Sequence, residues 1–162
     1  MVKMLLRNYV VISMTLLLCG CGYKFISNAK AKIFIQPVLN YSLQPLVDIY
    51  LTEFLRDVFI KYAEYQPVKN SSDAEYTLKV LIKKWERTPL FFSGERSREI
   101  VIAKFIIEAE VILYKGENIV FTDTITDNIS TSLGKEYEEE GVLKDISEKL
   151  ANKIYFRIID RK

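Results

Sequence analysis

The sequence predicts an α+β fold, a two-layer sandwich in which two helices pack on one face of a mostly antiparallel, four-stranded sheet. Apolar residues alternate with period two over several stretches and recur at spacings of three and four over two others. Each predicted helix has one apolar stripe, and the strands supply one wholly apolar sheet face. Packing the stripes on that face gives the order β-α-β-β-β-α.

The first predicted strand begins at Ala31, places Ile33 and Ile35 on one face and stops at Pro37. A helical period follows from Leu46 to about Tyr62. Its apolar stripe consists of Val47, Leu51, Phe54, Leu55, Val58 and Tyr62.

The second predicted strand, Tyr76–Trp85, alternates between two faces. One face holds Tyr76, Leu78, Val80 and Ile82, and the other holds Lys79, Leu81, Lys83 and Trp85. A loop rich in turn-forming residues is expected from Arg87 to Arg98. The next strand, about Glu99–Tyr114, has seven successive apolar positions on one face, which is the predicted core face.

The chain after Tyr114 predicts a hairpin, a fourth strand and a second helix. Gly116 suits the hairpin turn because glycine adopts positive φ without strain. In the fourth strand, simple alternation puts Asp123 and Asp127 on the same face as apolar residues, so a bulge or local exposure is needed and the register stays open. The final helix runs roughly over Val142–Ile159, with a stripe of Leu143, Ile146, Leu150, Ile154 and Ile158.

The N-terminus has the organisation of a secretory signal. Basic Lys3 and Arg7 precede an apolar run, Tyr9–Leu18, which is shorter than the roughly 20 residues a spanning helix needs. The sequence Leu18-Cys-Gly-Cys21 that follows resembles the lipobox of bacterial lipoproteins. We therefore expect residues 1–20 to be a signal peptide, Cys21 to carry the lipid and residues 21–162 to form one domain.

Two alternatives remain for this segment. The apolar run could be an uncleaved membrane anchor, or Cys19 and Cys21 could form a disulfide or bind a metal. The chain has no histidine, which makes the metal site the weaker alternative. By resemblance to Gram-negative lipoproteins, Gly22 in place of Asp after the lipidated cysteine favours the outer membrane, on its periplasmic side.

Charge and composition argue against nucleic-acid binding and against common catalytic sites. Residues 21–162 contain 21 basic and 21 acidic side chains, unlike a basic nucleic-acid binder. Without histidine, the usual Ser-His and Cys-His nucleophile arrangements are excluded. No glycine-rich phosphate loop occurs. We expect no enzymatic activity, no metal and no cofactor; the rival hypothesis is an enzyme that uses Asp123 and Asp127 as a carboxylate pair.

A binding surface is indicated on the second face of the sheet and in the loop after Trp85. Isoleucines beside lysines on that face, and Leu90, Phe91 and Phe92 among arginines in the loop, suit an anionic amphiphile or a protein interface. The candidate anion-binding residues are Lys83, Lys84, Arg87, Arg96, Arg98 and Lys104. The candidate partner-contact residues are Trp85, Leu90, Phe91 and Phe92. The structural alternative is that the phenylalanines cap the core edge and the lysines only prevent edge pairing.

The order of these features resembles the LptE (RlpB) family of outer-membrane lipoproteins. The resemblance covers nearly the whole chain after the predicted cleavage site. It rests on "CGYKF", on a first strand ending in proline in "IFIQPVLNYS", on a helix with "LTEFLRDVF" and on "SDAEYTLKVLIKKWERTPLFF". A long strand, a short glycine turn, another strand and an amphipathic helix complete the order.

The resemblance implies a plug inside the barrel of the outer-membrane translocon LptD, which supports assembly of the barrel and binds lipopolysaccharide. It also implies the α+β sandwich. The anion-binding candidates would then be the lipopolysaccharide-binding residues. The alternative is an outer-membrane lipoprotein that scaffolds another envelope complex.

Overall fold

The computed structural model describes residues 30–93, 99–133 and 139–161. Cys21, Arg96 and Arg98 lie outside the described residues. The elements in chain order are β1 (Ala31–Ile35), β2 (Leu39–Asn40), α2 (Val47–Tyr62), β3 (Tyr65–Val68), the short 3₁₀ helix η1 (Ser71–Asp73), β4 (Tyr76–Ser93), β5 (Glu99–Lys115), β6 (Asn118–Ser132) and α3 (Glu139–Ile159).

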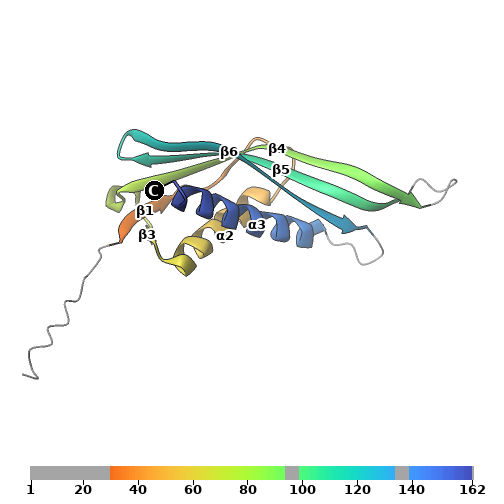
Figure 1. The fold of residues 1–162 in the computed structure, drawn as a ribbon, viewed down its shortest axis with the longest axis horizontal. Coiled ribbons are helices and arrows are strands. Elements are labelled where there is room, and N and C mark those ends of the chain that lie inside the picture. Colours follow the sequence, from red (N-terminus) through yellow and green to blue (C-terminus); the bar gives the residue numbers. More distant parts are fainter. Residues whose placement is uncertain (1–29, 94–98, 134–138, 162) are drawn as a thin grey trace, which may run out of the picture.

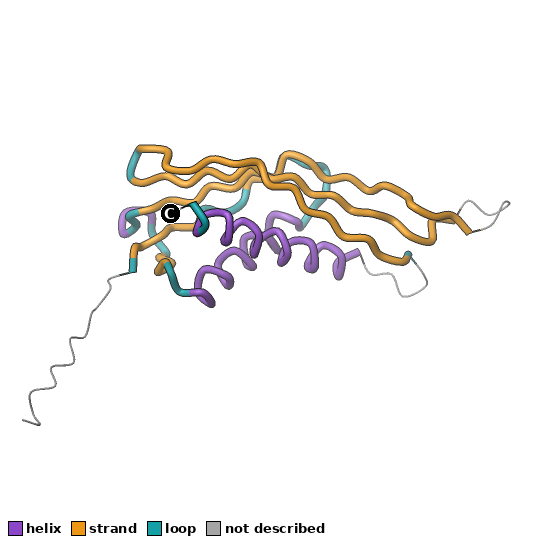
Figure 2. Tube along the Cα trace, in the orientation of Figure 1, coloured by secondary structure: helices purple, strands orange, loops and turns teal. Residues whose placement is uncertain are grey.

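The strands form one mixed, largely antiparallel sheet. Its order is β3-β1-β4-β5-β6, and β2 also pairs with β4. The long strands β4, β5 and β6 are antiparallel, whereas β1 runs parallel to β3 and β4, and β2 runs parallel to β4. Both helices lie on one face of the sheet (Figure 1; Figure 2). The predicted α+β fold is confirmed.

Two short strands were not expected from the sequence. Strand β2 has two residues, too few for a period-two pattern. Strand β3 contains Pro67, which would interrupt a central strand but is tolerated here because β3 is an edge of the sheet. Together β2 and β3 enlarge the predicted four-stranded sheet without changing its layers.

Strand β4 is longer than the sequence predicted. It continues through Arg87–Ser93, where a loop was expected, and pairs with β5 along this extension. Pro89 is compatible with a strand here because β1 and β2 pair only with the first part of β4, up to Ile82. The extension is therefore an edge, where a missing N–H costs no ladder bond. The paired ends of β4 and β5 run beyond both helices (Figure 1).

A β-bulge at Lys83 corrects the predicted face of Trp85. The register of β4 against β5 shifts between Ile82 and Lys84, so Lys83 is the extra residue. Trp85 then pairs with Ile107 on the helix-facing side, and its ring lies 5.8 Å from that of Phe105. The prediction that Trp85 shares a face with Lys79, Leu81 and Lys83 was wrong, because one extra residue exchanges the two faces.

The hairpin between β5 and β6 settles the open register of the fourth strand. Gly116 has φ 59°, which confirms the predicted glycine turn. A second register shift follows, since Leu113 pairs with Phe121 while Tyr114 pairs with Ile119, which leaves Val120 as the extra residue. From Phe121 onward the odd-numbered side chains, including the partly buried Asp123 and Asp127, face the helices.

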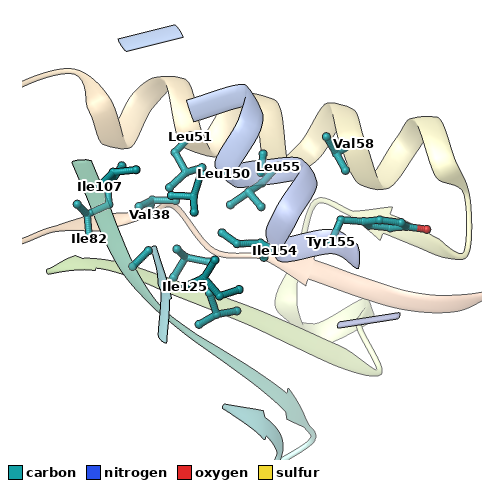
Figure 3. Packing of buried hydrophobic residues seen from close by; sticks show 14 of the residues in the cluster. Val38, Leu51, Leu55, Val58, Ile82, Ile107, Ile125, Leu150, Ile154 and Tyr155 are labelled. Carbon is teal, nitrogen blue, oxygen red and sulfur yellow. The ribbon is translucent and has the colours of Figure 1, made fainter. Parts of the chain in front are cut away.

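The core lies between the helices and the apolar sheet face (Figure 3). Leu51 and Leu55 of α2 and Leu150 and Ile154 of α3 have no exposed surface, as the predicted helical stripes require. In α2 the fully buried Phe59 was not predicted, whereas the predicted Tyr62 is 38% exposed. Aromatic rings join the helices at one end. The ring centroids of Phe59 and Tyr155 are 5.0 Å apart, and those of Tyr62 and Tyr155 are 4.9 Å apart.

The start of α3 is held to α2 by Glu140. The Tyr50 hydroxyl donates to Glu140 Oε1 at 2.9 Å, and Lys144 Nζ lies 2.7 Å from the same oxygen. Lys144 and then Tyr50 lower the pKa of Glu140 below its ordinary value. Two glutamates in this first turn also complement the positive end of the helix dipole, so α3 begins at Glu139 rather than at the predicted Val142.

Candidate ligand- and partner-binding surface

Neither helix covers the second face of the sheet (Figure 2), which we call the outer face. Cross-strand pairs fix its composition: Lys84 is opposite Glu108, Glu86 is opposite Ile106, and Thr88 is opposite Lys104. The outer face of β4 and β5 consists of Lys79, Leu81, Lys84, Glu86, Thr88, Ile102, Lys104, Ile106, Glu108, Glu110, Ile112 and Tyr114.

Isoleucines form an aliphatic row on this face. Ile102, Ile106 and Ile112 of β5 are half-buried although no helix covers them, because β4 and β6 flank them on both sides. On β6 they are opposite the uncharged residues Ser132, Asn128 and Thr122. The predicted mixture of aliphatic and charged groups on the second face is thus present in the structure.

Two of the predicted anion-binding lysines are paired with glutamates of the same surface. Lys83 Nζ lies 2.8 Å from Glu110, and Lys84 Nζ lies 2.8 Å from Glu86. These hydrogen bonds raise the pKa of each lysine, so both stay protonated well above neutral pH. An anionic ligand would have to compete with the two carboxylates for these cations.

Lys104 occupies a different setting. It lies between Ile102 and Ile106 along β5 and is opposite Thr88, half-buried on the outer face. No salt bridge joins Lys104 to any residue in the described ranges. A cation flanked by aliphatic side chains on an open face can contact an anionic head group and an acyl chain together.

The structure separates Arg87 from the lysines. Arg87 pairs with Phe105, and its guanidinium carbon lies 5.8 Å from the Phe105 ring centroid, on the helix-facing side beside Trp85. This separation follows from the bulge at Lys83. The predicted residues Arg96 and Arg98 fall in the stretch 94–98, outside the described residues.

Three of the predicted partner-contact residues lie at the far end of β4. Leu90, Phe91 and Phe92 are 44%, 63% and 55% exposed, so they do not cap the core edge. Val101 on β5 is exposed in the same part of the hairpin. Trp85, the fourth candidate, is partly buried against the core. The projecting end of the β4–β5 hairpin is therefore an exposed apolar surface.

A groove beside β3 escaped the sequence reading because β3 itself was not predicted. It has a volume of about 480 Å³. Arg56 of α2 and Lys69 stand among its apolar walls, and Ile60 is 63% exposed there. The residues that line it are Phe34, Ile35, Arg56, Ile60, Pro67, Val68 and Lys69.

The carboxylates of the rival enzyme hypothesis have structural partners. Asp123 Oδ2 lies 4.0 Å from Arg161, and Asp127 Oδ2 lies 3.8 Å from Lys153. Each aspartate also accepts the backbone N–H of the next residue. Over the described ranges no three His, Cys, Asp or Glu side chains gather in a metal-binding arrangement. None of the helices described here is long and apolar enough to span a bilayer.

Comparison with known proteins gives structural matches only. The sequence matches no protein-family profile and no curated protein. The fold is similar to that of the hypothetical protein CT253 from Chlamydia trachomatis, with TM-score 0.57 and 10% identity over 80% of this chain and 95% of that chain. It is also similar to uncharacterized lipoprotein B from Nitrosomonas europaea, with TM-score 0.53 and 14% identity over 79% and 81%.

A third solved structure, the minor lipoprotein from Acinetobacter baumannii, matches with TM-score 0.51 and 12% identity over 80% of this chain and 93% of that one. Identities this low establish the fold alone. Two of these three proteins are lipoproteins by name. The chain therefore has the fold of lipoprotein B and similar lipoproteins, which is the fold that its resemblance to the LptE (RlpB) family implied.

Proposed function

We propose that the chain is a lipopolysaccharide-assembly lipoprotein of the LptE kind. In this role it binds lipopolysaccharide and acts as plug and assembly partner of an LptD-like outer-membrane β-barrel, without enzymatic activity. The observation that carries the proposal is the open outer face, where the half-buried Ile102 and Ile106 flank Lys104. The similarity of the fold to lipoprotein B supports it.

Lys104 and its isoleucine neighbours suit the two chemical parts of a lipopolysaccharide. The ammonium group pairs with a phosphate of the lipid, and the aliphatic row contacts its acyl chains. Arg96 and Arg98 remain candidates for the same role. Lys83 and Lys84 contribute only if the phosphates displace Glu110 and Glu86, which lie 2.8 Å from these lysines.

The barrel partner is proposed to contact the projecting end of the β4–β5 hairpin. Leu90, Phe91 and Phe92 are exposed there, and exposed aromatic residues are characteristic of the centres of protein interfaces. A domain enclosed by a barrel also meets protein on more than one side, which suits a sheet with helices on only one of its faces.

Membrane attachment is assigned to the N-terminus in this proposal. Cys21 carries the lipid after removal of residues 1–20, and the domain is held on the periplasmic side of the outer membrane. The likeness to proteins named as lipoproteins supports this assignment. Mass spectrometry of the purified protein checks it: we expect an acylated N-terminal Cys21, and an intact Met1 would contradict it.

Charge reversal at Lys104 tests the ligand assignment. We expect Lys104→Glu to weaken lipopolysaccharide binding by at least about tenfold, because a charge-assisted contact contributes about 1.5–3 kcal/mol. The matched control is Lys149→Glu, an exposed charge reversal on α3, away from the outer face, which leaves binding unchanged. Equal affinities for Lys104→Glu and the unaltered protein, measured by titration with purified lipopolysaccharide, would contradict the assignment.

The second candidate function is an outer-membrane lipoprotein that scaffolds another envelope complex. The pairing of Lys83 and Lys84 with glutamates favours this alternative, since it reduces the charge available to an anionic lipid. A scaffold would retain protein partners while showing no affinity for lipopolysaccharide.

A further inference from the structure

Strand β6 forms a long free edge of the sheet. It has 15 residues and pairs with β5 on one side only. Such an edge offers unpaired backbone groups to a strand of another molecule, and charged side chains commonly prevent this. The outer-face side chains of β6 carry no charge: they are Thr122, Thr124, Thr126, Asn128, Ser130 and Ser132.

The direction of the backbone groups of β6 follows from one hydrogen bond. The N–H of Leu133, just after β6, donates to the carbonyl oxygen of Val101 in β5 at 2.8 Å. Backbone groups of successive residues point alternately to the two sides of a strand, and the register from Phe121 to Ser132 is unbroken. Odd-numbered residues therefore bond to β5, and even-numbered residues direct their N–H and C=O groups to the free edge.

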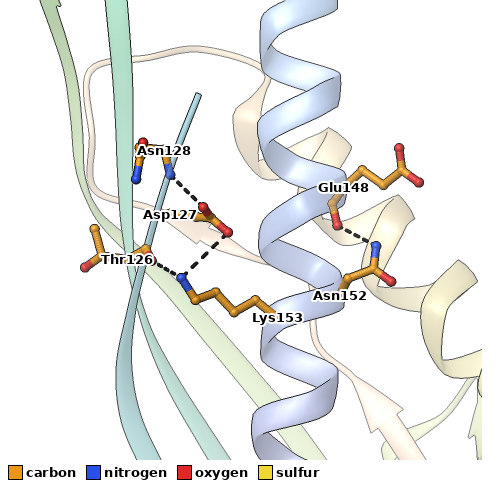
Figure 4. A network of polar contacts seen from close by, with 6 residues as sticks. All are labelled: Thr126, Asp127, Asn128, Glu148, Asn152 and Lys153. Carbon is orange, nitrogen blue, oxygen red and sulfur yellow. Dashed lines mark hydrogen bonds and ion pairs between the residues drawn. The ribbon is translucent and has the colours of Figure 1, made fainter. Parts of the chain in front are cut away.

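Three successive edge-directed residues are bound by side chains of the same molecule. The N–H of Thr124 donates to Asp123 Oδ1 at 2.9 Å, and the N–H of Asn128 donates to Asp127 Oδ1 at 2.7 Å. Between them, Lys153 Nζ donates to the carbonyl oxygen of Thr126 at 2.7 Å. Figure 4 shows Lys153 reaching from α3 to this carbonyl and to Asp127.

Helix α3 and the turn that follows it hold the two aspartates in place. Lys153 lies 3.8 Å from Asp127, and Arg161 lies 4.0 Å from Asp123. The aspartate side chains are only 19% and 25% exposed, because they point toward the helix layer. Charged side chains on the inward side of an edge strand are a recognised means of preventing edge pairing. We call Asp123, Asp127 and Lys153 the edge network.

We propose that the edge network closes β6 to strand addition, and that β6 is the surface through which two copies of this chain pair when the network is removed. The pairing is antiparallel about a two-fold axis at Thr126, which places Thr124 of one copy opposite Asn128 of the other. The partner strand needs the same backbone groups that the network occupies. The uncharged outer row adds no like-charge repulsion between the copies. This inference does not depend on the proposed function.

The test removes the network from the full chain in detergent and measures its mass by native mass spectrometry. The triple variant D123V/D127V/K153M replaces both acceptors and the donor with apolar side chains suited to the helix–sheet boundary. We expect the unaltered protein to be a monomer and the variant to double in mass. Hydrogen exchange of the Thr124 and Asn128 amides should slow in the variant as the protein concentration rises.

Two further variants make the result specific to β6. Adding Thr126→Pro to the triple variant removes an edge-directed N–H without removing a ladder bond, so it should restore the monomer. Lys149→Met, a matched loss of an exposed lysine on α3, should stay monomeric. If the triple variant fails to fold, the double variant D127V/K153M is tested instead, because it frees the Asn128 N–H and the Thr126 carbonyl together. A dimer is then expected at high concentration.

Three outcomes would overturn the proposal. The first is a network-free variant that folds and stays monomeric at all concentrations. The second is a dimer that Thr126→Pro does not dissociate, since the copies would then pair elsewhere. The third is an unaltered protein that already pairs through β6, since the edge would then be open.

Discussion

Tyr65 is a phenol buried beneath the helix layer, 2% exposed, and burial raises its pKa from 10.0 to about 12. Its ring packs against Phe59 and Tyr76 at centroid distances of 5.9 and 5.5 Å. Between pH 10 and 12 the unfolded chain releases the phenolic proton while the folded chain keeps it. The folded state therefore loses stability as pH rises through this window.

We predict that Tyr65→Phe removes part of the alkaline loss of stability. Phe preserves the ring packing and has no proton to release. Between the two pKa values, the free energy of unfolding of the unaltered protein should fall more steeply with pH than that of Tyr65→Phe. The difference between the two slopes approaches about 1.4 kcal/mol per pH unit. Urea unfolding of both proteins at pH 9, 10 and 11 measures it. Parallel losses of stability in both proteins would show that Tyr65 does not titrate in the folded state as described.

A substitution at Leu150 tests whether the predicted face of α3 packs in the core. This residue is fully buried between α3 and the sheet, so Leu150→Ala should lower the free energy of unfolding by about 2–5 kcal/mol through the cavity it leaves. The neighbouring exposed Lys149→Ala should change it by less than about 0.5 kcal/mol. Denaturant unfolding followed by circular dichroism measures both, and similar effects at the two positions would contradict the assigned helix face.

At the scale of elements, the bulge in β4 determines which side chains belong to the outer face. Lys83 is extra, since Ile82 pairs with Ala109 and Lys84 pairs with the adjacent Glu108. Deleting Lys83 would therefore heal the ladder and leave every later pair unchanged. Deleting Leu81 instead would move Ile82 to the outer face and Lys83 into the core opposite Ala109.

We predict that the chain tolerates deletion of Lys83 but not of Leu81. Loss of Lys83 removes one exposed ion pair, worth about 0.2–1 kcal/mol. Loss of Leu81 buries a lysine and should cost several kcal/mol. Trp85 is the only tryptophan, so its fluorescence during urea unfolding reports both effects. A red-shifted native spectrum after deletion of Lys83 would mean that Trp85 had changed face, against the observed register.

Helices and strands with a long, regular apolar pattern could be predicted from the sequence. The short strands, the pairing of distant strands and the bulge in β4 could not. Helix α2 begins one residue after the predicted Leu46 and ends at the predicted Tyr62, because buried apolar residues recur at helical spacing from Val47 to Phe59. Strands β2 and β3 are too short, or too interrupted by proline, to show a period, and their parallel pairing joins distant segments. The bulge could not be predicted, because two successive lysines follow Ile82 and either of them is compatible with an exposed position on the outer face or in a bulge.

Some residues of the candidate site could likewise be predicted from the sequence, and others could not. The isoleucine row and Lys104 follow from alternation along β5, which is regular. Arg87 and Trp85 were placed with them only because the bulge upstream was not visible in the sequence. The ion pair between Lys83 and Glu110 joins adjacent strands, so no single stretch of sequence could show that this lysine already has a carboxylate partner.

At the scale of the whole molecule, the two layers cover only part of the sheet. Helices α2 and α3 bury one face over its central part, while the β4–β5 hairpin projects beyond them with exposed aromatic residues (Figure 1). Neither helix covers the outer face, although Leu81 beside β2 is buried there, and Lys104 lies among isoleucines on it. An open face and a projecting apolar hairpin are the two surfaces through which the proposed lipid and barrel partners would bind.

The most direct test of the proposed function is affinity purification of the full chain from detergent-solubilised outer membranes, with mass spectrometry of the proteins that co-purify. The account predicts a large β-barrel protein in near-equal amount that remains bound at high salt, because apolar contacts are not screened by ions. The protein recovered alone, or with soluble partners only, would contradict the plug and favour the scaffold.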